Sequence, residues 1–379
     1  MIKLTVRWMN RFAEIEFPCT DTELQQKLTE VRPTDTSPDE IFVQAVHQPT
    51  MLSMLEDQFL NMDEVNFLAK RMDSFTYDEL LQFYAAAQYE QLQSPKDLIN
   101  LTYNLPCYTV VHDLRNLEAI GKTHYMNIHG AVSASEMKKI DFAAIGRELI
   151  RSGNGKPTEC GLLFKNQDVP YEEVYDGVNF PEYYHTECLA AVSITHGRKT
   201  EHLYLPCDEL SITKAMYRIG AANTDELTVR LDSLEVDAPE WSDRIKQLLC
   251  DSSIYDVNEV LTALNSADIN LEKMSAIIEY AGNQDEPAAI IALAANIDDF
   301  VFIPNVDDAE DVSRHYLSQR RDFHIPGDLD DYFDYGAHGK AIMEQSQGAF
   351  VTGGCICMKE GCDLDEILSD TQDQGMGGI

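Results

Sequence analysis

The stretch Leu329-Asp-Asp-Tyr-Phe-Asp-Tyr-Gly-Ala-His-Gly-Lys-Ala-Ile342 decides how the chain is organised, because an earlier stretch matches part of it. Asp141-Phe-Ala-Ala-Ile-Gly-Arg-Glu-Leu149 lines up with Asp334-Tyr-Gly-Ala-His-Gly-Lys-Ala-Ile342, 193 positions apart. Acidic, aromatic, small, glycine, basic and aliphatic positions follow in the same order. The later stretch has the pattern of a short helix with aromatic residues on one side and carboxylates on the other.

Almost the same offset applies on both sides of this match. Val257-Asn258 corresponds to Val65-Asn66, and Pro287 corresponds to Pro95, each 192 positions apart. Further matches are the openings Phe17-Pro18-Cys19 and Leu205-Pro206-Cys207, the strand-like runs Tyr108–Val111 and Phe300–Ile303, and the runs that begin at Gly161 and Gly354. A repeat that contains six or seven elements is a domain-sized duplication, not a solenoid unit.

Local signals place helices and strands within each copy. Thr20-Asp-Thr-Glu23 and Thr76-Tyr-Asp-Glu79 are capping boxes that each predict the start of a helix. Ser94-Pro95 is a favourable start for a third helix. Residues 4–8 alternate as a strand that can pair with residues 13–17.

We therefore predict an α+β fold, with two copies of a module made of a small α/β part, a helical part and an α/β part. The segment between the copies carries too many Tyr and Phe residues for a freely solvated tether, whereas the end of the chain combines acids with Gln and Gly. The predicted boundaries are 1–60, 61–106 and 107–165 in the first copy, 166–187 for an aromatic and acidic linker, 188–250, 251–298 and 299–359 in the second copy, and 360–379 for an acidic flexible tail.

The charge balance is the strongest compositional signal. Among 379 residues, 65 are Asp or Glu and 29 are Lys or Arg, which gives a net charge of −36 and a pI near 4.4. Residues 1–187 hold 16 basic and 29 acidic side chains, and residues 188–379 hold 13 and 36. Solubility alone is served by a net charge of about 2–8 in a small domain. Such a field repels nucleic acids and anionic membranes and attracts basic surfaces.

The N-terminus and the cysteines indicate a cytoplasmic protein. Met1-Ile-Lys-Leu-Thr-Val-Arg-Trp8 carries charges within its apolar run, which is typical of a strand and not of a signal peptide. No run approaches the roughly 20 apolar residues of a membrane span. The chain has nine cysteines, an odd number, and it is large enough to fold without disulfides, so reduced thiols are expected.

Signals for enzymatic or metal chemistry are weak. Cys355-Ile-Cys357 with Cys362 is the best metal candidate, but the C-x-C spacing differs from zinc knuckles, and buried reduced cysteines are the better interpretation. Gly327–Gly336 lacks the glycine and glutamate of a calcium loop. His112, His124 and His315 lack a catalytic partner in sequence. With no phosphate-binding loop, nucleophile elbow or HExxH motif, we predict no enzyme, no metal and no cofactor.

The acidic residues of the second copy form a dense series. A solvated helix face is the plain interpretation, but like charges packed closely cost stability unless a cationic partner relieves the repulsion. Duplex DNA carries about one charge per 1.7 Å of axis, so 36 charges correspond to roughly 60 Å of duplex. The candidate partner-binding acids are Asp298, Asp299, Asp307, Asp308, Glu310, Asp311, Asp328, Asp330, Asp331 and Asp334.

The C-terminal half resembles the ArdA family of antirestriction proteins. The matching parts are Asp311-Val-Ser-Arg-His-Tyr-Leu317, Ile325-Pro326 and a motif formed by Leu329, Tyr332, Asp334, Tyr335, Ala337 and Gly339. The chain departs from the family motif at Gly336, His338, Lys340 and Ala341, which removes two acids. The resemblance covers about residues 290–345, is weaker over 190–290, and extends to 1–165 through the internal repeat.

This resemblance implies an elongated, three-part mimic of bent duplex DNA, here written twice in one chain as an intramolecular pseudo-dimer or forming a homodimer. It implies a type I restriction-modification enzyme as partner, with no direct binding of nucleic acid or membrane. An acidic inhibitor or adaptor of another nucleic-acid-binding machine, such as a CRISPR nuclease, remains an alternative. A zinc-binding protein is a further alternative.

Overall fold

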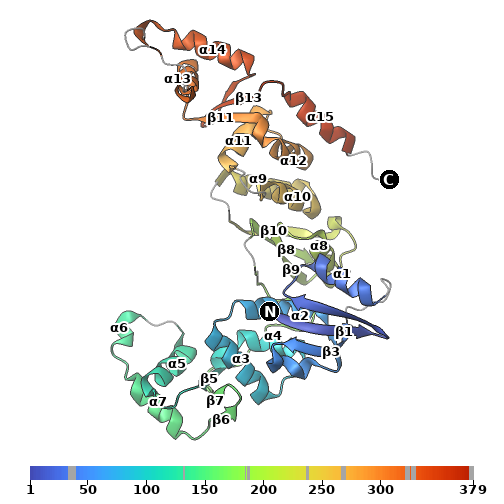
Figure 1. Cartoon of the computed structure of the whole chain (residues 1–379), viewed down its shortest axis with the longest axis vertical. Coiled ribbons are helices and arrows are strands. Elements are labelled where there is room, and N and C mark those ends of the chain that lie inside the picture. Colours follow the sequence, from blue (N-terminus) through green and yellow to red (C-terminus); the bar gives the residue numbers. More distant parts are fainter. Residues whose placement is uncertain are drawn as a thin grey trace. The chain divides into compact units, whose positions relative to one another are not determined.

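The computed structural model describes residues 1–32, 40–130, 133–183, 185, 188–235, 239–265, 270–320, 325 and 330–374. The chain divides into two compact units, residues 1–186 (unit 1) and 187–379 (unit 2). The fold is α+β: helices accompany small antiparallel sheets in both units (Figure 1). None of the described helices is long and apolar enough to cross a membrane.

Unit 1 contains two sheets with three helices between them along the chain. The first sheet has the strand order β2-β1-β3-β4 and the second has the order β5-β7-β6. The elements are β1 (Ile2–Trp8), β2 (Arg11–Phe17), α1 (Asp21–Val31), β3 (Glu40–Gln48), η1 (Thr50–Leu55), β4 (Gln58–Asn61), α2 (Met62–Asp73), α3 (Tyr77–Glu90), α4 (Pro95–Tyr103), η2 (Leu105–Cys107), β5 (Tyr108–Val111), α5 (Leu117–His129), α6 (Ala134–Met137), α7 (Phe142–Arg151), β6 (Lys156–Thr158) and β7 (Gly161–Lys165).

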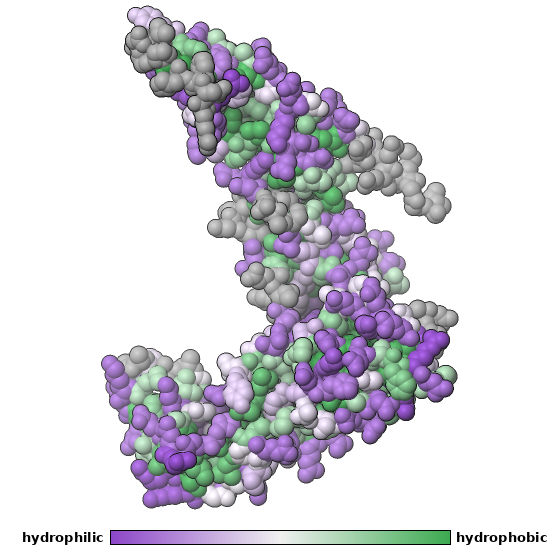
Figure 2. Space-filling view, viewed as in Figure 1, coloured by the Kyte–Doolittle hydropathy of each residue, from purple (hydrophilic) through white to green (hydrophobic). Residues whose placement is uncertain are grey.

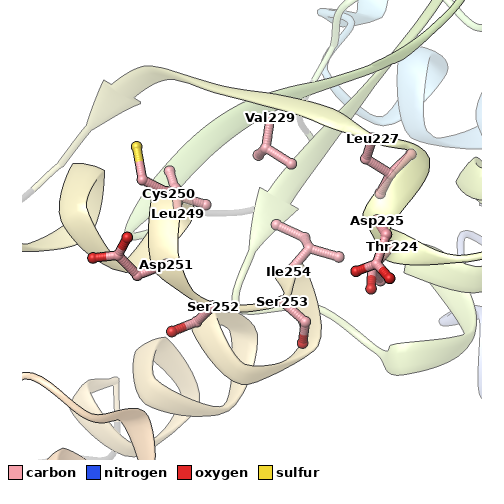
Figure 3. Close-up of a pocket in the computed structure, with 10 residues that line it drawn as sticks. All are labelled: Thr224, Asp225, Leu227, Val229, Leu249, Cys250, Asp251, Ser252, Ser253 and Ile254. Carbon is pink, nitrogen blue, oxygen red and sulfur yellow. The ribbon is translucent and has the colours of Figure 1, made fainter.

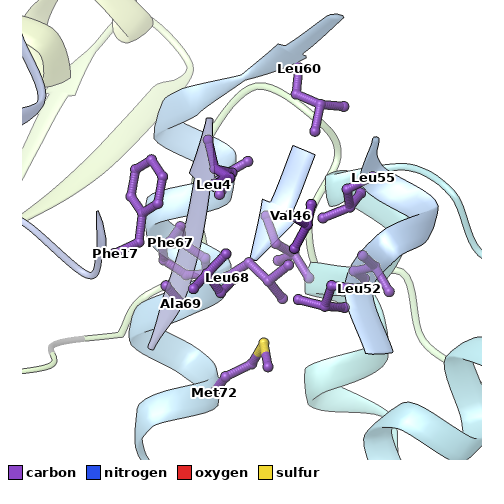
Figure 4. Packing of buried hydrophobic residues seen from close by; sticks show 14 of the residues in the cluster. Leu4, Phe17, Val46, Leu52, Leu55, Leu60, Phe67, Leu68, Ala69 and Met72 are labelled. Atoms are coloured by element: carbon purple, nitrogen blue, oxygen red, sulfur yellow. The ribbon is translucent and has the colours of Figure 1, made fainter. Parts of the chain in front are cut away.

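The local signals in the sequence produce these elements. Thr20 and Thr76 cap α1 and α3 through the predicted reciprocal boxes, and Ser94 caps α4, which has proline in its first turn. Strand β1 alternates, so Leu4 points inward with Val46 of β3 toward α2 and η1 (Figure 4). One core cluster runs from this sheet through α2–α4 to β5 and β7, so the three parts predicted within the first copy share a core.

Unit 2 repeats this plan. Its sheets have the orders β10-β8-β9 and β11-β13-β12. The elements are β8 (Ala190–His196), β9 (Lys199–Leu205), α8 (Glu209–Ile219), η3 (Thr224–Glu226), β10 (Thr228–Leu234), α9 (Pro239–Asp251), α10 (Ile254–Leu264), α11 (Leu271–Tyr280), α12 (Pro287–Ala295), η4 (Ile297–Asp299), β11 (Phe300–Pro304), α13 (Ala309–Gln319), η5 (Asp330–Tyr332), α14 (Tyr335–Gln345), β12 (Ala349–Val351), β13 (Gly354–Met358) and α15 (Leu364–Gln374).

An identical polar contact joins the first sheet to the helices in each unit. The side-chain amide of Asn66 on α2 accepts from the backbone N–H of Cys19 at 3.0 Å and donates to its carbonyl at 2.9 Å. In unit 2, Asn258 on α10 makes the same two bonds with Cys207, at 2.8 and 2.9 Å. Both asparagines are buried, so each contact satisfies groups that water does not reach. The shared contact shows that the repeat extends to side-chain detail.

The two units differ in the elements that connect the first sheet to the helices that follow it along the chain. Unit 1 places η1 and the fourth strand β4 there, whereas unit 2 places helix α9. Trp241 of α9 is almost fully buried in the core of unit 2. The helix extends to Asp251, across the predicted boundary at residue 250.

The segment that follows unit 1's last strand is fixed along α4 rather than free. Asn100 accepts from the backbone N–H groups of Val174 and Tyr175 at 2.7 and 2.8 Å, and Asn104 binds the backbone of Glu172 at both its N–H and its carbonyl. The Tyr175 ring is buried in the core. The aromatic residues that argued against a free tether therefore bind this segment to unit 1.

The predicted flexible tail is wrong for residues 364–374, which form helix α15. Leu364, Ile367 and Leu368 have helical spacing and pack with the core of unit 2 beside α12. Acid and glutamine content suggested disorder, but this short apolar stripe suffices to dock the helix. Residues 375–379 lie outside the described part of the chain.

Each unit carries a two-helix hairpin that packs on its second sheet through a small apolar cluster, separate from the main core. In unit 1 the hairpin is α5 and α7, which share a small apolar cluster with Val111 and Phe164. In unit 2 it is α13 and α14, whose cluster contains Val312, Ile342 and the two thiols of β13. These clusters are separate from the main cores, so each hairpin is attached through few apolar side chains.

Candidate functional site

The repeated stretch that opened the sequence analysis forms the second helix of each hairpin. In α14, Gly339 is buried at the crossing with α13, where a Cβ atom would lie 1.6 Å from the carbonyl oxygen of Ala309. In α7, a Cβ on Gly146 would lie 2.0 Å from the carbonyl oxygen of Leu117, and Gly121 of α5 has the same role from the other side. The motif glycine is therefore required by the close approach of two helix backbones.

The motif aspartate begins the helix. Asp334 accepts a hydrogen bond from the backbone N–H of Ala337 at 2.8 Å, and Asp141 accepts one from Ala144 at 2.9 Å. Asp308 caps α13 in the same way, accepting from Asp311 at 3.0 Å. A carboxylate at this position satisfies an otherwise unpaired N–H and interacts favourably with the helix dipole. These acids are held in place by the helices that they begin.

Acids of α13 and of the turn η5 are linked across the hairpin by one arginine and one tyrosine. Arg314 donates to Glu310 at 2.7 and 3.1 Å and lies 3.9 Å from the centre of the Tyr335 ring. The Tyr335 hydroxyl donates to Asp330, and this bond raises the pKa of the phenol. Ser313, which is fully buried, shares a hydrogen bond of 2.8 Å with His338. The two helices are thus joined by polar contacts as well as by the glycine crossing.

Most of the predicted acids are exposed, and most gather on this hairpin. Six of these acids are exposed: Asp307, Asp308, Glu310 and Asp311 at the start of α13, Asp330 in η5, and Asp334 at the start of α14. Asp328, Leu329 and the side chain of Asp331 lie outside the described residues. Of the other motif residues, Tyr332 is 86% exposed, Ala337 is exposed, and Tyr335 and Gly339 are buried.

Two predicted acids lie apart from the hairpin. Asp298, exposed, and Asp299, half-buried, are in η4 at the start of β11, whereas Asp307 follows the end of that strand. Five strand residues span about 16 Å, so these acids form a separate group. The carbonyl of Asp299 accepts from the N–H of Lys359 at 2.9 Å.

The hairpins of the two units differ in charge although they share a scaffold. Residues 305–348 hold ten acidic and four basic side chains, a net charge of −6, and the corresponding residues 113–155 hold five acidic and six basic, a net +1. Lys122, Lys138, Lys139, Arg147 and Arg151 of unit 1 are exposed. The visible surface of the space-filling view is mostly hydrophilic (Figure 2). A higher density of acidic residues therefore distinguishes the α13–α14 hairpin, which we call the acidic hairpin.

The cysteines do not form the suggested metal site in the described residues. The sulfur atoms of Cys355 and Cys357 are 4.0 Å apart, share a hydrogen bond and are buried beneath the acidic hairpin. That bond raises the pKa of Cys355 and lowers the pKa of Cys357 to about 6. Cys362 packs instead with the main core of unit 2. No three metal-ligating side chains converge in the part of the chain that the structure describes.

Unit 2 contains a pocket with a volume of about 330 Å³. Leu227, Val229 and Ile254 form its apolar part, with Asp225 and Asp251 to either side (Figure 3). Its described lining includes no histidine, lysine or arginine, and Asp251 accepts a hydrogen bond from Gln247.

Comparison with known proteins gives no family model that matches the chain and no matching curated protein. The sequence had located the acids and the motif, but it had not shown why the motif contains a glycine. Nor had it assigned a role to Asn66 and Asn258. The internal repeat could have identified these residues, because Asn66 and Asn258 occupy equivalent positions in the two copies. Gly146 and Gly339 are equivalent in the same way.

Proposed function

We propose that this chain is a cytoplasmic antirestriction protein that acts as a mimic of double-stranded DNA. The observation that carries the proposal is the acidic hairpin, which concentrates exposed carboxylates on two helices that are locked together at Gly339. The resemblance of residues 290–345 to the ArdA family supports the assignment. The target is a type I restriction-modification enzyme, whose Lys and Arg residues would bind the carboxylates in place of DNA phosphates.

The proposed inhibition needs no catalysis and no cofactor. Affinity comes from charge-assisted contacts and from the relief of repulsion among the acids, so it falls as salt screens the charges. Helix caps and the Arg314–Tyr335 contact hold several acids in place before binding, which lowers the entropy cost of association. The inhibitor and DNA compete for the same groove of the enzyme, so bound inhibitor and bound DNA exclude each other.

The test is a competition assay with a purified type I enzyme and unmodified DNA. We expect the wild-type chain to displace labelled DNA and to prevent cleavage, with a potency that falls steeply as salt rises. A variant with Asp307, Asp311 and Asp330 changed to asparagine should lose most of this potency. As the matched control, Asp113→Asn, Glu118→Asn and Glu148→Asn neutralise three exposed acids of the unit 1 hairpin and should change it little.

Two results would contradict the proposal. One is inhibition that persists when the enzyme has already bound DNA and DNA is in excess over the inhibitor. A mimic must compete with DNA, so excess DNA should prevent its inhibition. The other is equal potency of the two neutralised variants. Inhibition of a different DNA-binding machine, with no effect on type I enzymes, would replace the target while keeping the mimicry.

A further inference from the structure

The pocket of unit 2 lies where a strand of unit 1 has its equivalent. In unit 1, residues 58–61 form β4, which pairs with the start of β3 and directly precedes α2. The offset of 192 positions that relates α2 to α10 makes residues 250–253 the equivalents of β4. These residues form the end of α9 and the start of α10, and all four line the pocket. Among the described residues of unit 2, no strand takes the place of β4.

The opposite wall of the pocket is the stretch that pairs with β4 in unit 1. Strands β1 and β8 are 188 positions apart in the repeat, and their pairing makes Val229 equivalent to Val43 and Leu227 equivalent to Ile41. In unit 1 both residues are fully buried, and Ile41 pairs with Leu60 of β4. In unit 2 both are only half-buried. An apolar surface that β4 covers in unit 1 is therefore partly open in unit 2.

An apolar side chain that fills this place in unit 1 is missing from unit 2. Leu60 of β4 is 4% exposed and belongs to the core of unit 1 (Figure 4). Its equivalent is Ser252, a half-buried serine in the wall of the pocket. The cavity of about 330 Å³ is at the small end of ligand pockets, which have volumes of about 300–1,000 Å³. The space therefore suits a side chain of a partner better than a large cofactor.

The backbone of β10 is also directed toward this place. A two-residue turn joins β8 to β9, so His196 at the turn, and Ile194 two residues before it, point their N–H and carbonyl groups toward β9. Val229, opposite Ile194, therefore directs its own N–H and carbonyl away from β8. In unit 1 the carbonyl of the equivalent Val43 accepts from the N–H of Asp57, beside β4, at 2.9 Å. Such a strand edge is a template for pairing with another extended segment.

We propose that this site binds an extended, basic segment of a partner protein, which adds to the edge of β10 as β4 adds to β3. One apolar side chain of the segment, in the place that Leu60 has in unit 1, enters the cavity between Leu227 and Ile254. Basic residues on either side of it pair with Asp225 and Asp251, which flank the cavity (Figure 3). The described lining holds no lysine or arginine, and the net charge of −36 attracts a basic segment. Backbone pairing supplies affinity in such complexes, and side-chain pockets supply specificity.

A small amine is the other occupant that the cavity could take. Its methylene groups would cover the apolar wall and its ammonium groups would pair with the two carboxylates, but it would leave the edge of β10 without a strand. The internal repeat favours the peptide, because a strand of this same chain occupies the equivalent place in unit 1. The sequence of β4 therefore supplies the probe for an experiment.

The test is fluorescence anisotropy of the labelled peptide Lys-Lys-Gln-Phe-Leu-Asn-Lys-Lys, which places the sequence of β4 between lysines, titrated with the intact chain. We expect saturable binding that weakens as salt rises. Ser252→Leu introduces the side chain of unit 1 and should fill the cavity. It should weaken binding about tenfold or more, because burial of the peptide's leucine supplies about that much affinity. Ser252→Ala changes the same residue without filling the cavity, and as the matched control it should bind nearly as the wild type does.

Two further changes test the charges and the backbone pairing. Asp225→Asn with Asp251→Asn should weaken binding by about threefold at low salt and by less at high salt. This pair of exposed positions also provides a second variant if Ser252→Leu alters folding. A peptide whose glutamine and leucine amides are N-methylated keeps its side chains but loses the N–H groups that pair with β10, so it should bind about tenfold more weakly.

No saturable binding up to about 1 mM peptide would overturn the proposal, and so would equal affinity of the wild type and Ser252→Leu. Equal affinity of the N-methylated peptide would overturn strand addition. Spermidine that binds more tightly than the peptide, and that Ser252→Leu no longer binds, would assign the cavity to a small amine and overturn the proposal as well. The peptide is measured without a restriction enzyme, and Ser252→Leu should keep full inhibition, so failure of this proposal and failure of the proposed function are separate outcomes.

Discussion

The hairpins α5–α7 and α13–α14 have the same construction and different surfaces. Both cross at a glycine that follows a capping aspartate, Asp141 with Gly146 and Asp334 with Gly339. Their net charges are +1 and −6 over corresponding residues. Helix capping fixes the aspartate and backbone contact fixes the glycine, whereas the exposed positions are free to change. The comparison indicates that packing and capping keep the glycine and the aspartate in both copies. Under the proposed function, the partner is recognised by exposed residues that differ between the two hairpins.

The largest effect is expected from a side chain at the crossing of the acidic hairpin. Gly339→Val places a Cβ 1.6 Å from the Ala309 carbonyl oxygen, so the helices must separate. We expect a loss of about 3 kcal/mol in the stability of the hairpin, and about 100-fold weaker inhibition. Gly146→Val should separate the α5–α7 hairpin equally and leave inhibition nearly unchanged. Hydrogen exchange of each hairpin and a cleavage-protection assay measure both effects; equal losses of inhibition would show that the hairpins do not differ in function.

A second experiment gives the unit 1 hairpin the negative charge that distinguishes the acidic hairpin. Lys138→Glu, Lys139→Glu and Arg147→Glu change three exposed positions and bring the net charge of residues 113–155 from +1 to −5. If charge on this scaffold is what the target binds, potency should rise by about tenfold at low salt and by less at high salt. The control changes the same positions to glutamine. A gain that is equal for glutamine and glutamate would point away from charge.

A smaller effect is expected from changes at Asp334, which distinguish the capping role of this residue from its charge. Asp334→Ala removes the acceptor for the Ala337 N–H and should cost about 1 kcal/mol in the stability of α14. Asp334→Asn keeps an acceptor and loses only the charge. We expect hydrogen exchange to detect the alanine change but not the asparagine change, and Asp141→Ala to have the same local effect in α7. An asparagine variant as destabilised as alanine would contradict the capping role.

The smallest effect concerns pH and one residue of α5. Burial lowers the pKa of His124, which shares one hydrogen bond with Thr109. The unfolded chain therefore binds the proton more readily, so unit 1 loses stability as pH falls below the ordinary histidine pKa of about 6.5 and gains none above it. The corresponding residue of α13 is Tyr316, so unit 2 has no histidine at this position. Hydrogen exchange of α5 at two pH values should show the loss in the wild type and not in His124→Tyr; a loss of equal size in both would assign it to another group.

Local signals predicted much of the fold, because caps and alternation act over a few residues. The boxes at Thr20 and Thr76 begin helices as expected, and Tyr108–Val111 is a strand. The helix at residues 364–374 was missed because its apolar stripe is short and its composition is acidic. Docking against α12 stabilises it, and that contact depends on the folded unit.

The candidate site was predicted only in part, for a related reason. The acids were visible in sequence because they are dense, but Asp298 and Asp299 proved to lie at the other end of β11 from the rest. The glycine crossing and the Arg314–Tyr335 contact join residues far apart in the chain, so periodicity alone does not reveal them.

The most direct test of the account measures how the chain competes with DNA for a type I enzyme as salt is varied. The wild type should displace DNA, and the logarithm of its affinity should fall linearly with the logarithm of the salt concentration, as for a ligand that carries many phosphate-like charges. Neutralising Asp307, Asp311 and Asp330 should reduce both the affinity and that slope, and neutralising acids of the α5–α7 hairpin should reduce neither. An affinity that is independent of salt, or a slope that the acidic hairpin does not determine, would contradict the claim that these carboxylates stand in for DNA phosphates.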